Sequence, residues 1–355
     1  MKLSASPITT NLTAIIKPEQ IPLPPELFQK LPFALGTRLL LTPSAPGTID
    51  VTCAAAGEKA GQSVVFNNRE HFPLTKDTAI KAGSDVGDIV ALTVDAGAVK
   101  IQKLDDPKAS TFGNGGVDAE GVALPPSWLI QAFTGRPSLQ AFVNSGKTGA
   151  QAIAGLVRSA GQDIAEFGAI LDFGCGCGRV LRALSKMTKA SLHGIDLHED
   201  AIEWCKTYLP YGEFDVGSEY PPIGLGDGSI DLLYAISVLT HLDETHQNLW
   251  LAEWRRVVRP GGLVIATFRG EDFVDQHINQ APYVQVIKNG WKDNNGFAFI
   301  SHKQWAGVFP DYYSDAYHTA DYVHSHWGRY FDVLQTLPSG AIGNRQEAAL
   351  LRRRP

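Results

Sequence analysis

Residues 169–181 read Ala-Ile-Leu-Asp-Phe-Gly-Cys-Gly-Cys-Gly-Arg-Val-Leu. The apolar start, Ala169 to Leu171, predicts a short buried strand that ends at Asp172. Glycines then alternate at positions 174, 176 and 178, and the apolar spacing from Val180 onward predicts a helix. A strand, a glycine-rich turn and a helix N-terminus are the parts with which an α/β sheet holds a nucleotide-like ligand at the carboxyl ends of its strands.

The glycine spacing argues against two common nucleotide sites. A dinucleotide fingerprint needs a third glycine, but counting from Gly174 or Gly176 places Arg179 or Leu181 there. The Gly-Lys-Ser/Thr ending of a phosphate-binding loop is also missing from this turn. Asp172, in a turn without a basic phosphate clamp, favours a ligand with a cationic head, such as an ammonium or a sulfonium. The alternative role for Asp172 is to cap the following helix.

The run Leu-Asp-Phe-Gly-Cys-Gly-Cys-Gly at 171–178 resembles the first motif of class I S-adenosylmethionine-dependent methyltransferases. Asp196 ends a second apolar strand 22 residues after Gly174, where an acid would bind both ribose hydroxyls. The resemblance places the turn under the methionine part of the cofactor and the adenine near residues 214–222. The cofactor contacts implied are Asp172, Gly174, Cys175, Gly176, Gly178, Asp196, Leu197, Asp215, Val216, Ser218 and Ser237.

The same family order continues along the chain. Residues 229–236 predict a buried parallel strand, and residues 263–268 a further strand after the helix-breaking Pro-Gly-Gly at 260–262. The segments that begin at Phe331 and Glu347 resemble the antiparallel sixth and seventh strands. The strand before Asp215 is poorly marked. The expected fold is therefore α/β, a Rossmann-like seven-stranded methyltransferase sheet.

Changes in composition and in residue spacing along the chain predict how it divides into domains. Residues 1–30 form a proline-rich, extended lead-in, residues 31–104 a small β-barrel domain, and residues 105–123 a Gly/Asp-rich linker. The barrel is similar to an uncharacterised bacterial family related to swapped-hairpin folds, from which no site residue follows. Its expected strands are 38–42, 48–53, 63–66, 89–94 and 98–102, with a helix at 76–82. The methyltransferase domain spans 124–355, with a helical cap at 124–160 and an inserted aromatic-rich segment at 269–330.

Two histidines are the candidate catalytic residues. His241 follows the fourth strand, where the acceptor meets the transferable methyl in this fold, and a neutral imidazole there could accept a proton. His318, within Ala-Tyr-His-Thr, is the second candidate base. The alternative is that these rings cap helices or pack in the core. No metal is expected, because Cys175-x-Cys177 has no second Cys/His pair at zinc spacing and no acid or cysteine converges on His318.

The amino-acid composition limits the kinds of molecule with which the protein is expected to interact. The net charge is −6, and Arg352–Arg354 is the only basic run, which argues against a nucleic-acid surface. No apolar stretch is long enough to span a bilayer and no signal core opens the chain, so a cytoplasmic enzyme without a membrane partner is expected. The expected function is methyl transfer from S-adenosyl-L-methionine to a small-molecule acceptor. The alternatives are a peptide or protein methyltransferase that docks its substrate on the β-domain, and a non-catalytic cofactor-binding scaffold.

Overall fold

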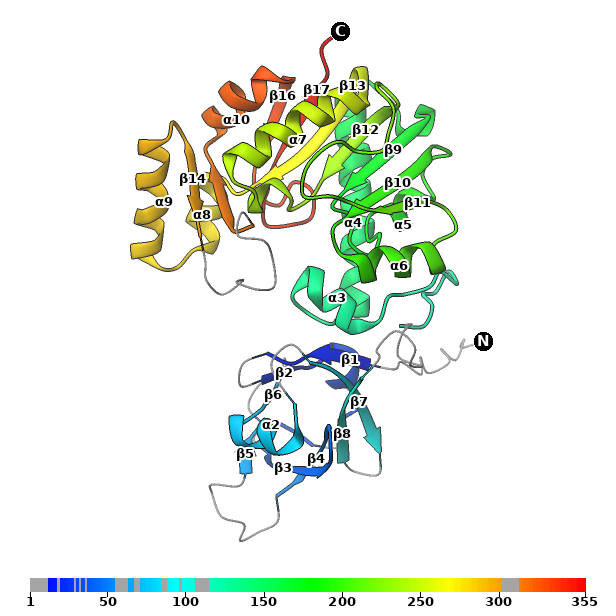
Figure 1. Ribbon diagram of the computed structural model, residues 1–355, viewed down its shortest axis with the longest axis vertical. Helices are drawn as coiled ribbons and strands as arrows, with labels where there is room; N and C mark the ends of the chain where they lie inside the picture. The colour runs from blue at the N-terminus through cyan, green and yellow to red at the C-terminus, as the bar shows by residue number, and fades with distance from the viewer. Residues whose placement is uncertain are drawn as a thin grey trace. The chain divides into compact units, whose positions relative to one another are not determined.

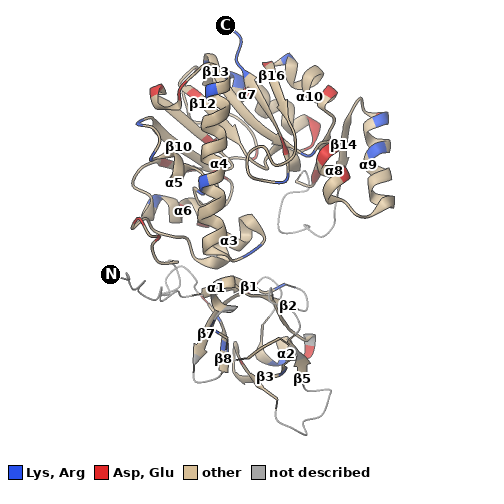
Figure 2. Ribbon diagram, turned by 180° about the vertical axis from the view of Figure 1, so that it is seen from behind, with Lys and Arg blue, Asp and Glu red and all other residues tan. Residues whose placement is uncertain are grey.

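The computed structural model describes residues 12–17, 20–28, 30–31, 33–35, 37–54, 63–66, 71–84, 88–95, 98–105, 115–301 and 313–355. The chain divides into two compact units, residues 1–143 and 144–355 (Figure 1). Figure 2 shows Lys and Arg interspersed with Asp and Glu over elements of both units. In the described part of the chain, no helix combines the length and the apolar character needed to cross a membrane.

The first unit is built on an antiparallel sheet in the order β1-β7-β8-β4-β3-β5, beside a two-stranded pair, β2-β6. The bounds are β1 Leu12–Ile15, β2 Gln20–Pro22, α1 Pro25–Phe28, β3 Arg38–Ala45, β4 Thr48–Cys53, β5 Ser63–Val65, β6 His71–Pro73, α2 Lys76–Ala82, β7 Ile89–Asp95 and β8 Ala98–Lys103. The expected strands and helix of this region are confirmed, with ends that differ by up to three residues. Strands β1 and β2 lie within the expected lead-in, and closure into a barrel remains a prediction.

Helix α3 (Ser127–Thr134) packs with the strands of this first unit. Its Gln131 side chain accepts a hydrogen bond from the Ile15 N–H at 2.9 Å and donates one to the Ile15 carbonyl at 3.1 Å. The buried amide thereby satisfies both backbone groups of one residue of β1. Helix α4 (Leu139–Ser159) begins in the first unit and continues into the second.

The second unit holds a seven-stranded sheet in the order β11-β10-β9-β12-β13-β17-β16. The bounds are β9 Ala169–Phe173, β10 Ser191–Asp196, β11 Glu213–Val216, β12 Ile230–Ala235, β13 Val258–Phe268, β16 Asp332–Leu337 and β17 Glu347–Arg352. Strands β9 to β13 pair in parallel, and β17 runs antiparallel to both β13 and β16. The predicted Rossmann-like sheet with an antiparallel end is confirmed.

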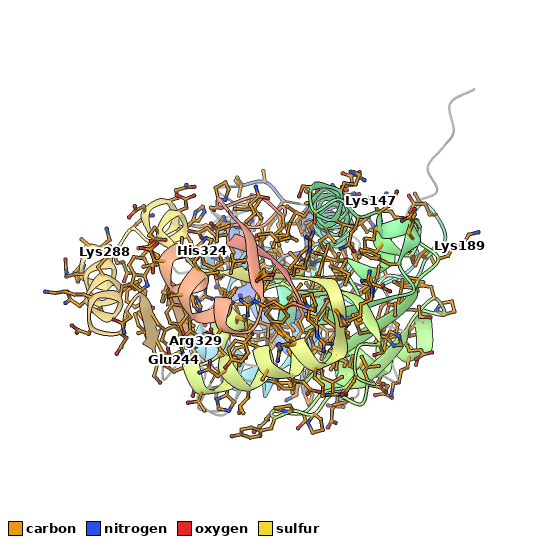
Figure 3. All side chains as sticks on the ribbon, turned by 90° about the horizontal axis from the view of Figure 1, so that it is seen from above. Lys147, Lys189, Glu244, Lys288, His324 and Arg329 are labelled. Carbon is orange, nitrogen blue, oxygen red and sulfur yellow. The ribbon has the colours of Figure 1, made fainter. Side chains whose placement is uncertain are left out.

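Helices cover both faces of this sheet. Figures 1 and 2, which view the molecule from opposite sides, show α4 and α7 (Glu244–Val257) on opposite faces. Figure 3 shows Lys147 of α4 and Glu244 of α7 on either side of the strands. Asp243 caps α7 by accepting from the His246 N–H at 2.8 Å, and the helix ends directly in β13. The shorter helices between strands are η1 Ile164–Glu166, α5 Leu181–Leu184, α6 Glu199–Tyr208 and the 3-10 turn η2 Leu239–His241.

The inserted segment between β13 and β16 builds a small lobe of its own. It contains α8 Glu271–His277, α9 Ala281–Asp293, β14 Phe297–Ile300, β15 Asp315–His318, α10 Ala320–His326 and η4 Trp327–Arg329. Val274, Ile287, Trp291 and Tyr317 form a separate apolar cluster within it. Many of its aromatic side chains therefore pack a core instead of lining a pocket. Residues 302–312, with Trp305 and Phe309, lie outside the described residues.

Candidate functional site

The glycine turn after β9 adopts a backbone that explains its three alternating glycines. Gly174, Gly176 and Gly178 have φ of 83°, 51° and 67°, in the left-handed region that side chains with a Cβ rarely adopt. The N–H groups of Gly174 and Cys175 both donate to the Ile195 carbonyl of β10, at 2.7 and 3.0 Å. The turn is thus fixed to the neighbouring strand at the carboxyl edge of the sheet.

The turn is also crowded by its neighbours. A Cβ on Gly174 would overlap the Val238 side chain, and one on Gly178 would lie 2.8 Å from Leu209 Cδ1. On the α4 side, a Cβ on Gly146 would overlap the Arg179 carbonyl. Glycine is required here for close approach as well as for its φ angle.

Asp172 is the second-last residue of β9 and has a buried carboxyl group. Its side chain is 3% exposed, and its Oδ2 accepts a hydrogen bond from the Tyr234 hydroxyl of β12 at 2.8 Å. Burial raises the pKa of Asp172 to about 7, against the hydrogen bond from Tyr234 and the nearby Arg179 guanidinium, which lower it. Because burial makes ionisation of this carboxyl group unfavourable, a bound cation would stabilise its charged form, and Asp172 is a candidate cation-binding residue.

Asp196 ends β10 and holds the turn through its side chain. Its Oδ2 accepts from the Gly176 N–H at 2.8 Å, and its Oδ1 accepts from the His198 N–H at 2.9 Å. Burial raises its pKa, opposed by these backbone hydrogen bonds. Because a carboxylate offers about four acceptor positions, each oxygen can still take a hydroxyl.

Two exposed apolar side chains, Leu197 and Val216, lie at the carboxyl ends of β10 and β11. Val216 pairs with Asp196 in the parallel register, and Val216 and the adjacent Leu197 are 47% and 44% exposed. Such exposed aliphatic groups suit the face of a planar ring. Asp215 forms an ion pair with Lys206 at 3.3 Å.

A pocket of about 300 Å³ extends along β10 and β11 from this end. Asp215, Val216 and Ser218 line it together with residues of the following loop and Trp250 of α7. The structure thereby brings the residues expected beside adenine to one cavity.

Ser237 follows β12 with φ of 62°, a conformation unusual for a residue with a side chain. Its N–H donates to Thr267 Oγ1 at 2.7 Å, and its hydroxyl donates to Gln346 Oε1 at 3.0 Å. These contacts hold the segment that also carries Val238 against the glycine turn. Strained backbone of this kind occurs often at functional sites.

His241, the first candidate base, lies in η2 after the carboxyl end of β12. Its Nδ1 is 2.9 Å from the Ser314 carbonyl, so Nδ1 carries the proton, and Nε2 lies 3.4 Å from Nη2 of Arg269. The ring stacks on Tyr313 at 4.5 Å. Burial and the Arg269 charge lower its pKa to about 4, against the Ser314 carbonyl and Asp315, which raise it. The imidazole is neutral near pH 7, and its lone pair faces a guanidinium.

Arg269 links the end of β13 to the inserted lobe. It forms an ion pair with Asp315, and its guanidinium lies 5.7 Å from the Phe273 ring centre and 5.6 Å from that of Tyr317. Both distances fit cation–π contacts. Together with the hydrogen bond between the Ser314 N–H and the His241 carbonyl, this cluster fixes β15 to η2.

His318 occupies a different environment from the one expected of a base. Its ring has no exposed surface, and its Nε2 lies 3.0 Å from Oε1 of Gln247, whose Nε2 donates to the Leu239 and Leu242 carbonyls. Burial lowers its pKa to about 3. The structure places His318 behind η2, where it supports the segment that carries His241 and does not line the site.

The cysteines of the turn are buried thiols. Cys175 and Cys205 each donate to the Gly176 carbonyl at 3.5 Å, and burial raises the pKa of Cys175, Cys177 and Cys205. Raised thiol pKa values and burial make these groups poor nucleophiles. Within the described ranges, no group of three or more His, Cys, Asp or Glu side chains is arranged to hold a metal ion.

Sequence reasoning missed several residues of this arrangement. Tyr234 and Arg269 sit in or next to apolar strands and carry no motif, and Gly146 is one of several helix glycines. The one available signal for Tyr234 was the parallel register, which pairs it with Asp172.

Comparison with known proteins agrees with the site. Residues 170–262 match a family model described as a methyltransferase domain. The chain is 26% identical over 133 residues to 24-methylenesterol C-methyltransferase 2 of Arabidopsis thaliana, covering 34% of this chain and 35% of that protein. It is 32% identical over 114 residues to O-methyltransferase cnsE of Penicillium expansum, covering 30% and 39%. The chain thus spans between a third and two fifths of the length of these curated relatives.

Among solved structures, a SAM-dependent methyltransferase from Methanosarcina mazei is 19% identical, with coverage of 54% of this chain and 93% of that one and a TM-score of 0.39. The magnesium protoporphyrin IX methyltransferase of Synechocystis, solved with bound SAH, is 14% identical, with coverage of 60% and 86% and a TM-score of 0.40. The glycine turn after β9 and Asp196 at the end of β10 both lie within the residues that match the methyltransferase domain.

Proposed function

We propose that this chain binds S-adenosyl-L-methionine at the glycine turn and transfers its methyl group to a small-molecule acceptor. The observation that carries the proposal is the turn itself, with three left-handed glycines between a buried acid and a second acid at the end of the next strand. The fit is chemical as well as geometric, because Asp172 in a buried site favours a cationic partner.

We assign residues of this chain to each part of the cofactor. Asp172 would take the ammonium, and the backbone of Gly174 to Gly178 would lie along the methionine part. Asp196 would accept from the ribose hydroxyls, which its free lone pairs permit. The apolar faces of Leu197 and Val216 would contact the adenine, with Asp215 and Ser218 at its edge and Ser237 at the methionine side.

The cofactor supplies an activated methyl and a neutral leaving group, so the protein can act mainly by alignment. Holding two reactants in line converts a bimolecular step into a nearly unimolecular one. Ser237 and Val238 are fixed to β13 and the turn, and His241 is fixed to β15, so the acceptor side is preorganised. His241 would act as a base only when Arg269 releases its Nε2, and His318 would act by positioning η2.

The small-molecule acceptor is supported by two observations. The matched relatives bear the names of a sterol methyltransferase and an O-methyltransferase. The Tyr313 ring stacks on His241 and is partly exposed, so it offers an aromatic face that suits an apolar or planar molecule.

The proposal is tested by a transfer assay with the full chain. Binding of S-adenosylmethionine is measured by calorimetric titration for the wild type and for Asp196→Ala. Both proteins are then incubated with S-adenosylmethionine and fractionated small-molecule extract, and formation of S-adenosylhomocysteine is measured. We expect turnover in at least one fraction and at least a tenfold loss in the variant. Absence of cofactor binding in the wild type overturns the proposal, whereas binding without turnover in any fraction favours the scaffold alternative.

A further inference from the structure

Next to the glycine turn, the hydroxyl of Tyr234 in β12 donates a hydrogen bond to Asp172 in β9. Tyr234 and Asp172 are paired residues of adjacent parallel strands, so their side chains extend to the same face of the sheet. The Tyr234 ring has no exposed surface, and its hydroxyl donates to Asp172 Oδ2 at 2.8 Å. Phenylalanine would fill the same buried space as Tyr234. The feature that needs a reason is therefore the hydroxyl group.

We propose that Tyr234 is a positioning residue for the cofactor, which holds the Asp172 carboxylate so that its second oxygen faces the ammonium of S-adenosylmethionine. This inference rests on the proposed function. Among the described residues, no hydrogen bond to Asp172 Oδ1 is present, so the pair leaves that oxygen available. One oxygen is thereby used to fix the group and the other to bind.

The hydroxyl also affects the ionisation of the carboxyl group. The hydrogen bond from Tyr234 and the charge of Arg179 favour the carboxylate, whereas burial and the negative charge of Asp196 disfavour it. The thiol of Cys175 and the phenol of Tyr234 are the other titratable groups beside it, and burial keeps both protonated. Loss of the hydroxyl therefore raises the pKa of Asp172 further, and a larger share of the protein holds a neutral acid that cannot pair with an ammonium.

The test uses two probes, of which only one carries the ammonium that Asp172 is expected to bind; the other also lacks the carboxylate and the sulfonium charge. S-adenosylmethionine carries the ammonium, whereas 5′-methylthioadenosine keeps the adenosine and lacks the amino-acid part. Affinities of the full chain for both are measured by calorimetric titration across pH 6 to 9, for the wild type, Tyr234→Phe and Tyr330→Phe. Tyr330 is the matched control, because its hydroxyl likewise donates to a side chain, Asn248, at 3.1 Å and it lies outside the proposed site.

For Tyr234→Phe we expect about a tenfold or greater loss of affinity for S-adenosylmethionine at pH 7, since hydrogen bonds to charged groups are the stronger ones. We expect the loss to shrink toward pH 9, with affinity for methylthioadenosine within about twofold of the wild type. Unchanged binding of S-adenosylmethionine, or equal losses for both probes, would overturn the inference. A wild type that binds neither probe would instead overturn the proposed function.

A double-mutant cycle covers the case in which the single variant folds poorly. If Tyr234 acts through Asp172, its hydroxyl should have no further effect on S-adenosylmethionine affinity once Asp172→Asn is in place. Additive losses in Asp172→Asn/Tyr234→Phe would show that the tyrosine acts independently and would overturn the inference.

Discussion

Replacing the buried acid of the turn should make the protein more stable and less able to bind its cofactor. Asp172 is 3% exposed and its pKa is raised from 3.8 to about 7, so its ionised form is disfavoured in the folded state relative to the unfolded chain. A native acid with a raised pKa binds protons that the unfolded chain has lost, and stability therefore falls as pH rises from about 4 to 7. Asn keeps an acceptor for the Tyr234 hydroxyl and removes the charge.

The size of the effect follows from the shift in pKa. Each unit corresponds to about 1.4 kcal/mol, so Asp172→Asn should raise the free energy of unfolding by up to about 4 kcal/mol at pH 8 and by up to about 2 kcal/mol at pH 5. Six of the seven tryptophans lie in residues 144–355, so urea unfolding followed by tryptophan fluorescence reports on the unit that contains Asp172. The same variant should bind S-adenosylmethionine at least about tenfold more weakly, because an ion-paired hydrogen bond is lost.

The matched control for this experiment is Asp163→Asn. Asp163 is an exposed acid that caps η1 by accepting from the Ala165 N–H, and Asn caps a helix equally well. Its stability should change little at either pH. If Asp172→Asn were less stable than the wild type at pH 8, or if its gain in stability were the same at pH 5 and pH 8, a raised pKa of Asp172 would be ruled out.

Three further outcomes follow from the contacts of the site. Gly174→Ala should lower the free energy of unfolding by about 1–3 kcal/mol, because the left-handed φ and the overlap with Val238 both oppose a Cβ; a neutral effect on urea unfolding would contradict the turn geometry. Glu347→Ala should destabilise the protein by about 1–3 kcal/mol, because its buried carboxylate accepts from backbone N–H groups at the start of α8, including that of Gly270 at 2.9 Å; calorimetry with Glu347→Gln as the milder variant would check this. The pKa of His241 is lowered to about 4, so the pH–rate profile of methyl transfer should show no acidic limb near pH 6.5 from this residue. A limb near pH 6.5 that disappears in His241→Gln would contradict the buried, Arg269-facing environment of the imidazole.

Much of the geometry around the glycine turn was predictable because it depends on short-range patterns. A strand, three alternating glycines and an acid at the end of the next strand are adjacent in sequence, and the parallel sheet brings their carboxyl ends together without further information. The structure places Gly174, Gly176 and Gly178 in the conformation that only glycine adopts readily, and it brings Asp196 into contact with the turn. The succession of strands followed the order that the family resemblance implies, although the strand before Asp215 was poorly marked in the sequence.

Side-chain contacts between segments that are distant in the sequence were less predictable, because no local pattern marks them. Tyr234 reads as one more apolar residue of a buried strand, and only the register places its hydroxyl beside an acid 62 residues away. A histidine pattern cannot distinguish His241, which is partly exposed, from His318, which is enclosed by aromatic rings. Arg269 and Asp315 meet only because the inserted lobe folds back onto the end of β13.

Cofactor binding at the glycine turn is tested most directly by calorimetric titration of the full chain with S-adenosyl-L-methionine at pH 8, alongside Asp196→Ala and the exposed-acid control Glu203→Ala. We expect one binding site per chain in the wild type and in Glu203→Ala, and at least tenfold weaker binding in Asp196→Ala. No binding in the wild type at millimolar cofactor, or equal affinity in all three proteins, would contradict the claim that the glycine turn between Asp172 and Asp196 is a methyl-donor site.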